Sequence, residues 1–111
     1  MNPATMARYI LNSAVLTDYG RFCLAGPLTL EQARQFLDQG AESAIGHAGA
    51  AQLISAELQR PVEVQRQSVT LAEGDQALVL RLLQRLPEGR VLDAAEAAAW
   101  PHEYALLTRL E

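Results

Sequence analysis

Apolar and polar positions follow one another along the chain in two different ways, and the contrast predicts both strands and helices. Short apolar runs rich in β-branched residues, and one stretch in which apolar and polar residues alternate, are typical of strands. About five of the following segments are expected to join one mixed sheet. The segments are 9–16, 21–24, 43–46, 62–69, 77–83 and 104–107.

Helical spacing occurs between these segments. Thr29 and Gln32 form a capping-box pair that predicts a helix start, and Gly40 is placed to end that helix in a left-handed conformation. An alanine-rich helix is expected over 48–59, and Asp93 begins a second capping-box pattern for a short helix. Strands that alternate with helices predict an α/β (α+β) fold in which helices flank the sheet.

The length of the chain limits how this fold is organised. The 111 residues suffice for a single domain, which we place at 8–111 behind a short flexible extension at 1–7. That extension lacks the basic and apolar regions of a signal peptide. No apolar run approaches the roughly 20 residues that cross a bilayer, so no membrane partner is expected.

Charge and cysteine content narrow the expected partners and compartment. Nine basic residues, all arginine, face thirteen acids, which gives a net charge of −4 and a pI near 5.1. Proteins that coat duplex nucleic acid usually carry a basic face, so no duplex partner is expected. Cys23 is the one cysteine, which excludes a disulfide within the chain and favours a reducing, cytoplasmic setting.

The pair Gly46-His47 is the most informative chemical feature, because it lies where an expected strand gives way to a helix. Backbone N–H groups at such a junction favour an anion such as phosphate, and Gly46 would let that anion approach closely. His47 could then donate a proton to a leaving oxygen. The alternative is a histidine that only packs or caps near the helix start.

Three arginines and one acid could complete a phosphate site. Arg66, Arg81 and Arg85 lie on or near two expected strands, and the planar guanidinium group suits phosphate oxygens. Glu88 follows Arg85 at a bend and could pair with it. The alternatives are solvated edge charges or carboxylate pairs for the arginines, and a surface acid in a turn for Glu88.

Asn12 and Ser13 are polar residues within the first expected strand. They could contact a ligand or satisfy a local bulge. Metal chemistry is poorly supported, because His47 and His102 lack metal-ligand spacing with nearby acids, and no glycine-rich phosphate loop occurs. Phosphoryl chemistry without a metal or other cofactor is therefore the enzymatic hypothesis.

Four separated segments occur in an order and spacing that resemble a known family. They are Tyr9-Ile10-Leu11-Asn12-Ser13-Ala14, Ser43-Ala44-Ile45-Gly46-His47, Asp75-Gln76-Ala77-Leu78-Val79 and Gln84-Arg85-Leu86-Pro87-Glu88-Gly89. Together they are similar to the viral ring nuclease family, type III anti-CRISPR proteins with cellular relatives in CRISPR loci. The resemblance runs from about Arg8 to the C-terminus.

The resemblance implies a homodimer that binds cyclic tetra-adenylate and cuts it to linear di-adenylate with 2′,3′-cyclic phosphate ends. Loss of that messenger would switch off the type III CRISPR response in the cytoplasm of the host cell. His47 would be the general acid, with Arg85 and Glu88 as its active-site partners. The resemblance also implies ligand contacts at Asn12, Arg66 and Arg81.

The chain departs from the family pattern at two positions. A family threonine is Ala50 here, and the acidic or polar residue that often follows the histidine is Ala48. The alternatives are a non-catalytic cyclic-nucleotide sponge, a small dimeric viral regulator that touches DNA, and a structural dimerisation module. Ring cleavage, salt-sensitive duplex binding and a ligand-dependent thermal shift are the observations that separate them.

Overall fold

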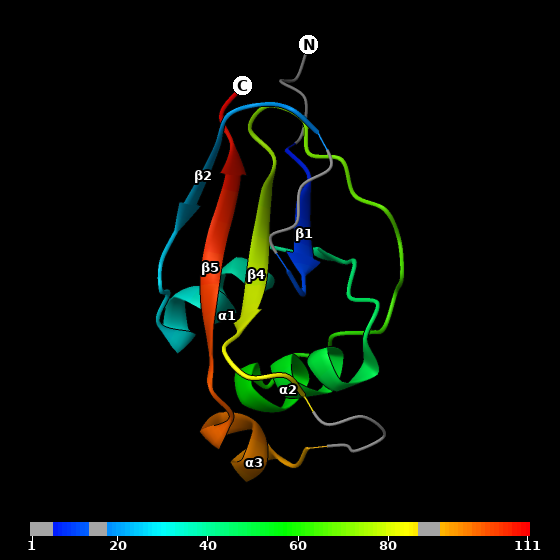
Figure 1. Ribbon diagram of the computed structural model, residues 1–111, viewed down its shortest axis with the longest axis vertical. Coiled ribbons are helices and arrows are strands. Elements are labelled where there is room, and N and C mark those ends of the chain that lie inside the picture. Colours follow the sequence, from blue (N-terminus) through cyan, green and yellow to red (C-terminus); the bar gives the residue numbers. More distant parts are fainter. Residues whose placement is uncertain (1–5, 14–17, 87–91) are drawn as a thin grey trace.

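The centre of the protein is one mixed sheet, as the sequence predicts. The computed structural model (Figure 1) describes residues 6–13, 18–86 and 92–111. The strands are β1 (Arg8–Leu11), β2 (Phe22–Ala25), β3 (Glu42–Ser43), β4 (Gln76–Leu82) and β5 (His102–Arg109). Their order in the sheet is β2-β5-β4-β1-β3. Strand β1 runs parallel to β3 and β4, whereas β5 runs antiparallel to β2 and β4.

The helices begin where the capping patterns predict. They are α1 (Leu30–Asp38), α2 (Ala48–Leu58) and α3 (Ala94–Ala99). Both hydrogen bonds of the capping box form at Thr29 for α1 and at Asp93 for α3. Gly40 has a φ of 91°, a left-handed conformation that suits glycine and turns the chain away from α1.

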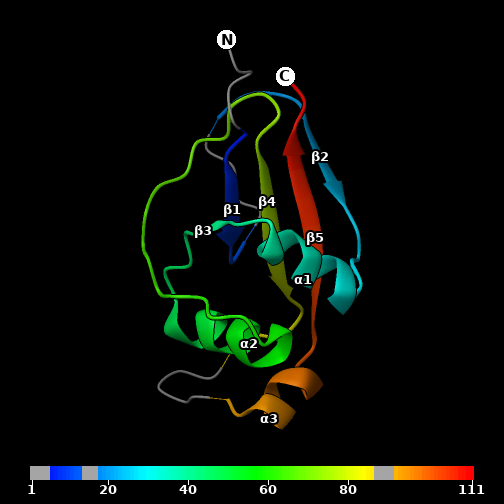
Figure 2. The same cartoon turned by 180° about the vertical axis from the view of Figure 1, so that it is seen from behind.

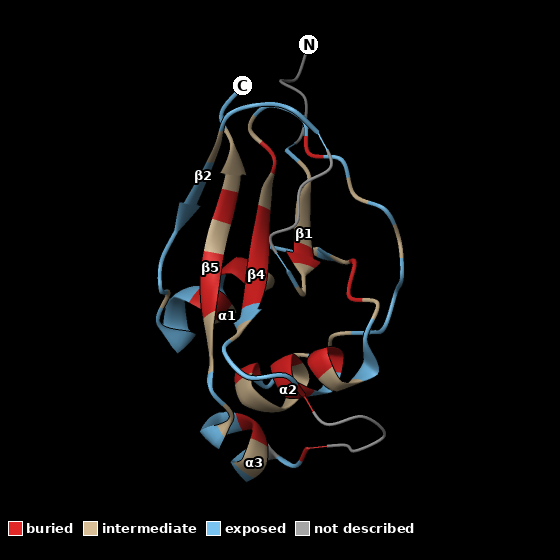
Figure 3. Ribbon diagram, viewed as in Figure 1, coloured by how far each residue is buried: buried red, intermediate tan, exposed pale blue. Residues whose placement is uncertain are grey.

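The two faces of the sheet are covered differently. On the helix face, side chains such as Ile10, Leu80 and Tyr104 pack against residues of all three helices. Helix α1 lies behind the sheet in Figure 1 and in front of it in Figure 2. On the loop face, Val79 packs with Leu71 of the long loop that joins α2 to β4. The buried residues therefore form two clusters that share β4 between them, and Figure 3 shows the buried centres of β4 and β5.

The segment 62–69 is a loop, so the prediction of a strand there is wrong. One backbone hydrogen bond, from the N–H of Gln65 to the carbonyl oxygen of Ile45 at 2.9 Å, and bonds that involve side chains hold it in place of a strand ladder. Ser43 Oγ donates to the carbonyl oxygen of Glu63 at 2.6 Å, and Gln67 Nε2 donates to the carbonyl oxygen of Ser43 at 2.7 Å. Arg66 consequently extends from a loop instead of a strand.

Strands β1 and β3 are shorter than the expected segments 9–16 and 43–46. Only two residues of β3 pair with β1, after which the chain leaves the sheet toward α2. Residues 1–5 and 14–17 lie outside the described residues. The N–H of Ala7 donates to Asp75 Oδ1 at 2.9 Å, so the chain is held to the loop before β4 from that residue onward.

Candidate functional site

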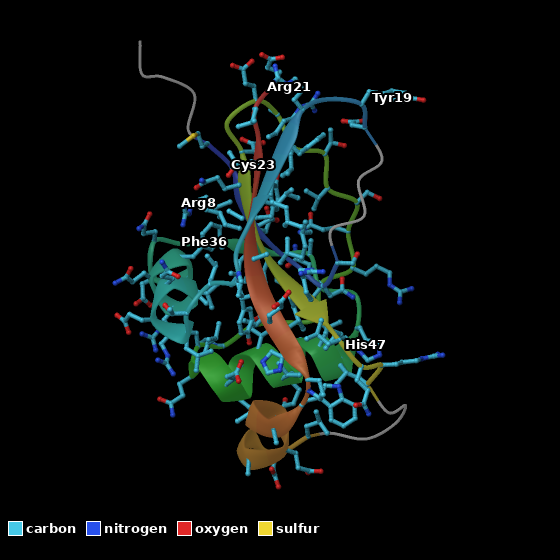
Figure 4. All side chains as sticks on the ribbon, turned by 60° about the vertical axis from the view of Figure 1, so that its left-hand side comes forward. Arg8, Tyr19, Arg21, Cys23, Phe36 and His47 are labelled. Atoms are coloured by element: carbon cyan, nitrogen blue, oxygen red, sulfur yellow. The ribbon has the colours of Figure 1, made fainter. Side chains whose placement is uncertain are left out.

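His47 is the N-cap residue of α2. Its backbone is extended, with φ −125° and ψ 120°, and its ring nitrogen Nδ1 accepts a hydrogen bond from the N–H of Ala50 at 3.2 Å. An acceptor nitrogen holds a lone pair, so in this arrangement the ring proton sits on Nε2. The side chain is exposed and lies beside α2, well away from the loop that carries Tyr19 (Figure 4).

Two glycines make room around His47. A Cβ on Gly49 would lie 2.9 Å from Cε1 of His47, closer than real Cβ atoms approach, so the imidazole needs a glycine here. A Cβ on Gly46 would lie 3.1 Å from Nε of Arg66. Nη2 of Arg66 donates to the carbonyl oxygen of Gly46 at 3.2 Å, which brings this arginine beside the residue that precedes His47.

Arg85 lies just beyond β4 on a segment that is anchored on both sides. Trp100 Nε1 donates to the carbonyl oxygen of Gln84 at 2.9 Å, and Leu86 is buried in the helix-face core. These anchors fix the backbone around Arg85, while its side chain stays exposed. Glu88, the acid that the resemblance places beside Arg85, lies outside the described residues.

Three of the expected site residues meet in one cleft of about 250 Å³, which we call the His47 cleft. Asn12 reaches it from the bend after β1, His47 from the start of α2 and Arg85 from beyond β4. The remaining lining residues are Ala50, Leu82 and Leu86. A guanidinium, an imidazole and an amide can all donate to phosphate oxygens, and the imidazole can also transfer a proton.

A second cavity of about 240 Å³, which we call the loop-face pocket, adjoins the His47 cleft at Asn12. Its apolar lining residues come from β1, β2, the residue after β3 and the long loop, and its polar ones include the expected ligand residue Ser13. The lining residues are Leu11, Asn12, Ser13, Asp18, Phe22, Ala44, Gln67, Ser68, Val69, Thr70 and Leu71.

Arg81 lies apart from both cavities. It projects from β4 and pairs with Glu103, its direct neighbour on β5. Both residues line a small cavity of about 110 Å³ beside β2. Within one chain the structure therefore does not bring Arg81 to His47, and the carboxylate pair considered as the alternative is the one that forms.

The residues that support the site were not predicted from the sequence. Gly49 carries a usable signal, because glycine in a helix costs stability relative to alanine and so suggests a packing requirement. Trp100 carries no such signal, since its hydrogen bond reaches a carbonyl 16 residues away. In the part of the chain that the structure describes, no three metal-ligating side chains cluster, and no helix is long and apolar enough to span a membrane.

Known proteins are similar to this chain in fold and in sequence. The fold of B116 of Sulfolobus turreted icosahedral virus gives a TM-score of 0.76 at 22% sequence identity, over 93% of this chain and 99% of that one. The uncharacterised protein YddF of Bacillus subtilis is 32% identical over 104 residues, which cover 91% of this chain and 95% of YddF. Uncharacterised protein 26 of a Sulfolobus islandicus filamentous virus is 34% identical over 92 residues, 79% of this chain and 78% of that protein.

The family assignment rests on a match that spans most of the chain. The match covers residues 8–105 and so includes every strand up to the middle of β5, together with all three helices. The His47 cleft and the loop-face pocket lie within it. The chain therefore belongs to the STIV B116-like family.

Proposed function

We propose that this protein is a ring nuclease that binds cyclic tetra-adenylate and cleaves it without a metal ion, which would end type III CRISPR signalling. The observation that carries the proposal is the His47 cleft, where an imidazole, a guanidinium and an amide from three separate segments line one cavity. The four sequence segments that resemble viral ring nucleases supply the class of ligand.

The reaction needs only groups that the chain and the ligand hold. The ribose 2′-hydroxyl attacks the adjacent phosphorus, the bond to the 5′-oxygen breaks, and a 2′,3′-cyclic phosphate remains. Arg85 binds the phosphate oxygens as negative charge develops, and His47 protonates the departing 5′-oxygen. Glu88 receives the proton that the hydroxyl loses, and it can also orient one of these groups.

The capping role of His47 and its role as an acid exclude each other. As a cap, Nδ1 accepts from the N–H of Ala50; as an acid, the imidazolium carries a proton on both nitrogens and cannot accept. His47 must therefore give up the hydrogen bond from Ala50 when it becomes the acid. A phosphate oxygen then becomes the acceptor at the start of α2, and its negative charge favours the imidazolium.

The loop-face pocket gives the proposal a place for a nucleobase. It combines apolar lining residues with amide and hydroxyl groups, which suits a flat heterocycle with hydrogen-bonding edges. Because Asn12 borders both cavities, a base in this pocket keeps its own nucleotide next to the His47 cleft. A homodimer on a two-fold axis would offer His47 and Arg85 twice to a ring that shares this symmetry.

The test is incubation of the purified protein with labelled cyclic tetra-adenylate in the presence of EDTA. The expected product is linear di-adenylate with 2′,3′-cyclic phosphate ends, and cyclic hexa-adenylate in a parallel reaction reports the preference for ring size. An uncut ring at stoichiometric enzyme would overturn the proposed nuclease, and tight binding without cleavage would identify a sponge.

A second measurement tests the shared site. Calorimetric titration of the His47→Asn variant with the ring should give one ring bound per two chains. Binding of one ring per chain would contradict a site formed across a dimer axis.

A further inference from the structure

Arg109 contacts two segments of the chain that contribute residues to the loop-face pocket. It is the last residue of β5, and its guanidinium reaches two separate segments. Nη2 donates to the carbonyl oxygen of Tyr19 at 3.0 Å, and Nη1 donates to the carbonyl oxygen of Leu71. Nη1 also lies 3.5 Å from Oδ2 of Asp18, and Nε donates to the carbonyl oxygen of Glu111 at 3.0 Å.

The surroundings of this guanidinium are shaped to receive it. The Arg109 Cζ atom lies 5.5 Å from the centre of the Phe22 ring, and Phe22 is the residue directly opposite Arg109 on β2. A Cβ on Gly20 would lie 3.1 Å from both Nε and Nη2 of Arg109. The arginine side chain is only 20% exposed, so its hydrogen bonds are largely shielded from water.

Three of the groups that Arg109 contacts are walls of the loop-face pocket. Asp18 and Phe22 line the pocket from the chain at the start of β2, and Leu71 lines it from the long loop. Arg109 is not among the described residues that line the pocket. Its effect on a ligand there must therefore pass through these neighbours.

We propose that Arg109 is a positioning residue for ligand binding: it sets the width of the loop-face pocket by tying Asp18 and Tyr19 to the 69–71 segment. This inference rests on the proposed function, in which the pocket receives a base of the cyclic nucleotide. Arginine is suited to the task because its planar fork satisfies several acceptors at once, whereas the single ammonium of lysine cannot hold both segments. We call the contacts of Arg109 with these two segments the Arg109 clamp. It contains none of the residues that line the His47 cleft.

The experiment compares Arg109→Met and Arg109→Lys with the unaltered protein in steady-state cleavage of cyclic tetra-adenylate. We expect KM to rise about tenfold to a hundredfold for Arg109→Met, because a small misplacement of a binding wall far from the chemistry can cost this much. The turnover at saturation should stay within about twofold, since the reacting groups are untouched. The KM of Arg109→Lys should lie between that of Arg109→Met and that of the unaltered protein. This second variant also keeps the test possible if Arg109→Met does not fold.

Arg21→Met is the matched control. Arg21 lies next to β2 at the same end of the sheet, but its side chain is 72% exposed and pairs with Glu111 at 3.5 Å. It should lower neither affinity nor turnover. An unchanged KM in folded Arg109→Met and Arg109→Lys would overturn the clamp while the nuclease stands, and so would a fall in turnover with KM constant. If the unaltered protein leaves the ring intact, the proposed function falls and the clamp falls with it.

Discussion

One nitrogen of His47 determines whether the residue stabilises a helix or serves the proposed reaction. In the structure, Nδ1 accepts from the N–H of Ala50, which satisfies one of the donors that the first turn of α2 would otherwise leave without an acceptor. Asparagine is a strong N-cap residue but cannot supply a proton, whereas alanine does neither. These two substitutions separate the cap from the acid.

We predict that His47→Asn and His47→Ala both lose cleavage by about 10²–10⁴-fold, the usual contribution of a general acid. Only His47→Ala should also lose stability, by about 1 kcal/mol for the missing cap. Single-turnover kinetics and urea unfolding of both variants provide the measurement. Cleavage at the normal rate by His47→Asn would remove the imidazole from the mechanism.

Gly49→Ala tests the space that the imidazole needs. Alanine favours a helix by about 1 kcal/mol over glycine, but its Cβ would lie 2.9 Å from Cε1 of His47. We predict that the ring is displaced and that turnover falls by about tenfold or more, because the acid is no longer aligned. Gln52→Ala, an exposed change on the same helix, is the control and should leave turnover unchanged. Equal turnover of Gly49→Ala and the control would show that the ring position does not matter.

At the scale of secondary-structure elements, a buried contact between a histidine and a glutamate joins α2 to β5. Nε2 of His102 lies 2.6 Å from Oε1 of Glu57, and the two side chains are only 6% and 7% exposed. Nδ1 of His102 contacts the carbonyl oxygen of Trp100, so both ring nitrogens have neighbours. A pair this deeply buried depends on both partners being present.

We predict that Glu57→Leu destabilises the protein by about 1–3 kcal/mol, because it leaves the buried Nε2 of His102 without its hydrogen-bond partner. The double variant Glu57→Leu/His102→Leu should recover much of this loss, since no polar group remains uncompensated. Urea unfolding of the single and double variants provides the comparison. Equal losses in the two would show that packing, and not the pair, holds α2 on β5.

Local patterns in the sequence predicted the elements whose ends are fixed locally. The capping boxes at Thr29 and Asp93 need only residues three positions apart, and both form. The alternation at 62–69 misled because β3 ends at Ser43: next to this segment the chain offers one backbone hydrogen bond, from Gln65 to Ile45, and side chains supply the other contacts.

The same distinction applies to the site. The expected residues at the ends of elements do converge, because the end of β1, the start of α2 and the end of β4 bring Asn12, His47 and Arg85 to one cleft. The position of Arg81 could not be predicted, since the register that sets it opposite Glu103 arises only when β4 and β5 pair. Arg109 was missed for a similar reason: its acceptors belong to segments distant in sequence.

At the scale of the whole molecule, Tyr104 links pH to the folding equilibrium. It is 2% exposed on the helix face, and its hydroxyl meets no hydrogen-bond partner among the described residues. Burial, reinforced by the nearby Glu57 carboxylate, raises the pKa of Tyr104 far above its ordinary value of 10.0. The folded protein therefore keeps this phenol neutral at a pH where the unfolded chain would ionise it.

We predict that the free energy of unfolding falls above about pH 10, at up to about 1.4 kcal/mol per pH unit from this group, because only the unfolded state gains from ionisation. Below that pH the group has no effect on the pH dependence. Tyr104→Phe should remove this part of the slope, which urea unfolding between about pH 9 and 11 would measure. The same slope in both proteins would contradict the prediction.

The hydrogen bond from Trp100 to Gln84 has a practical consequence. Trp100 is the only tryptophan in the sequence, and the carbonyl that its indole N–H holds comes one residue before Arg85. A ligand that moves Arg85 also moves the carbonyl of Gln84 and so changes the surroundings of the indole, whose ultraviolet emission responds to local polarity. The fluorescence of Trp100 in the unlabelled protein therefore reports the binding of a ligand at Arg85.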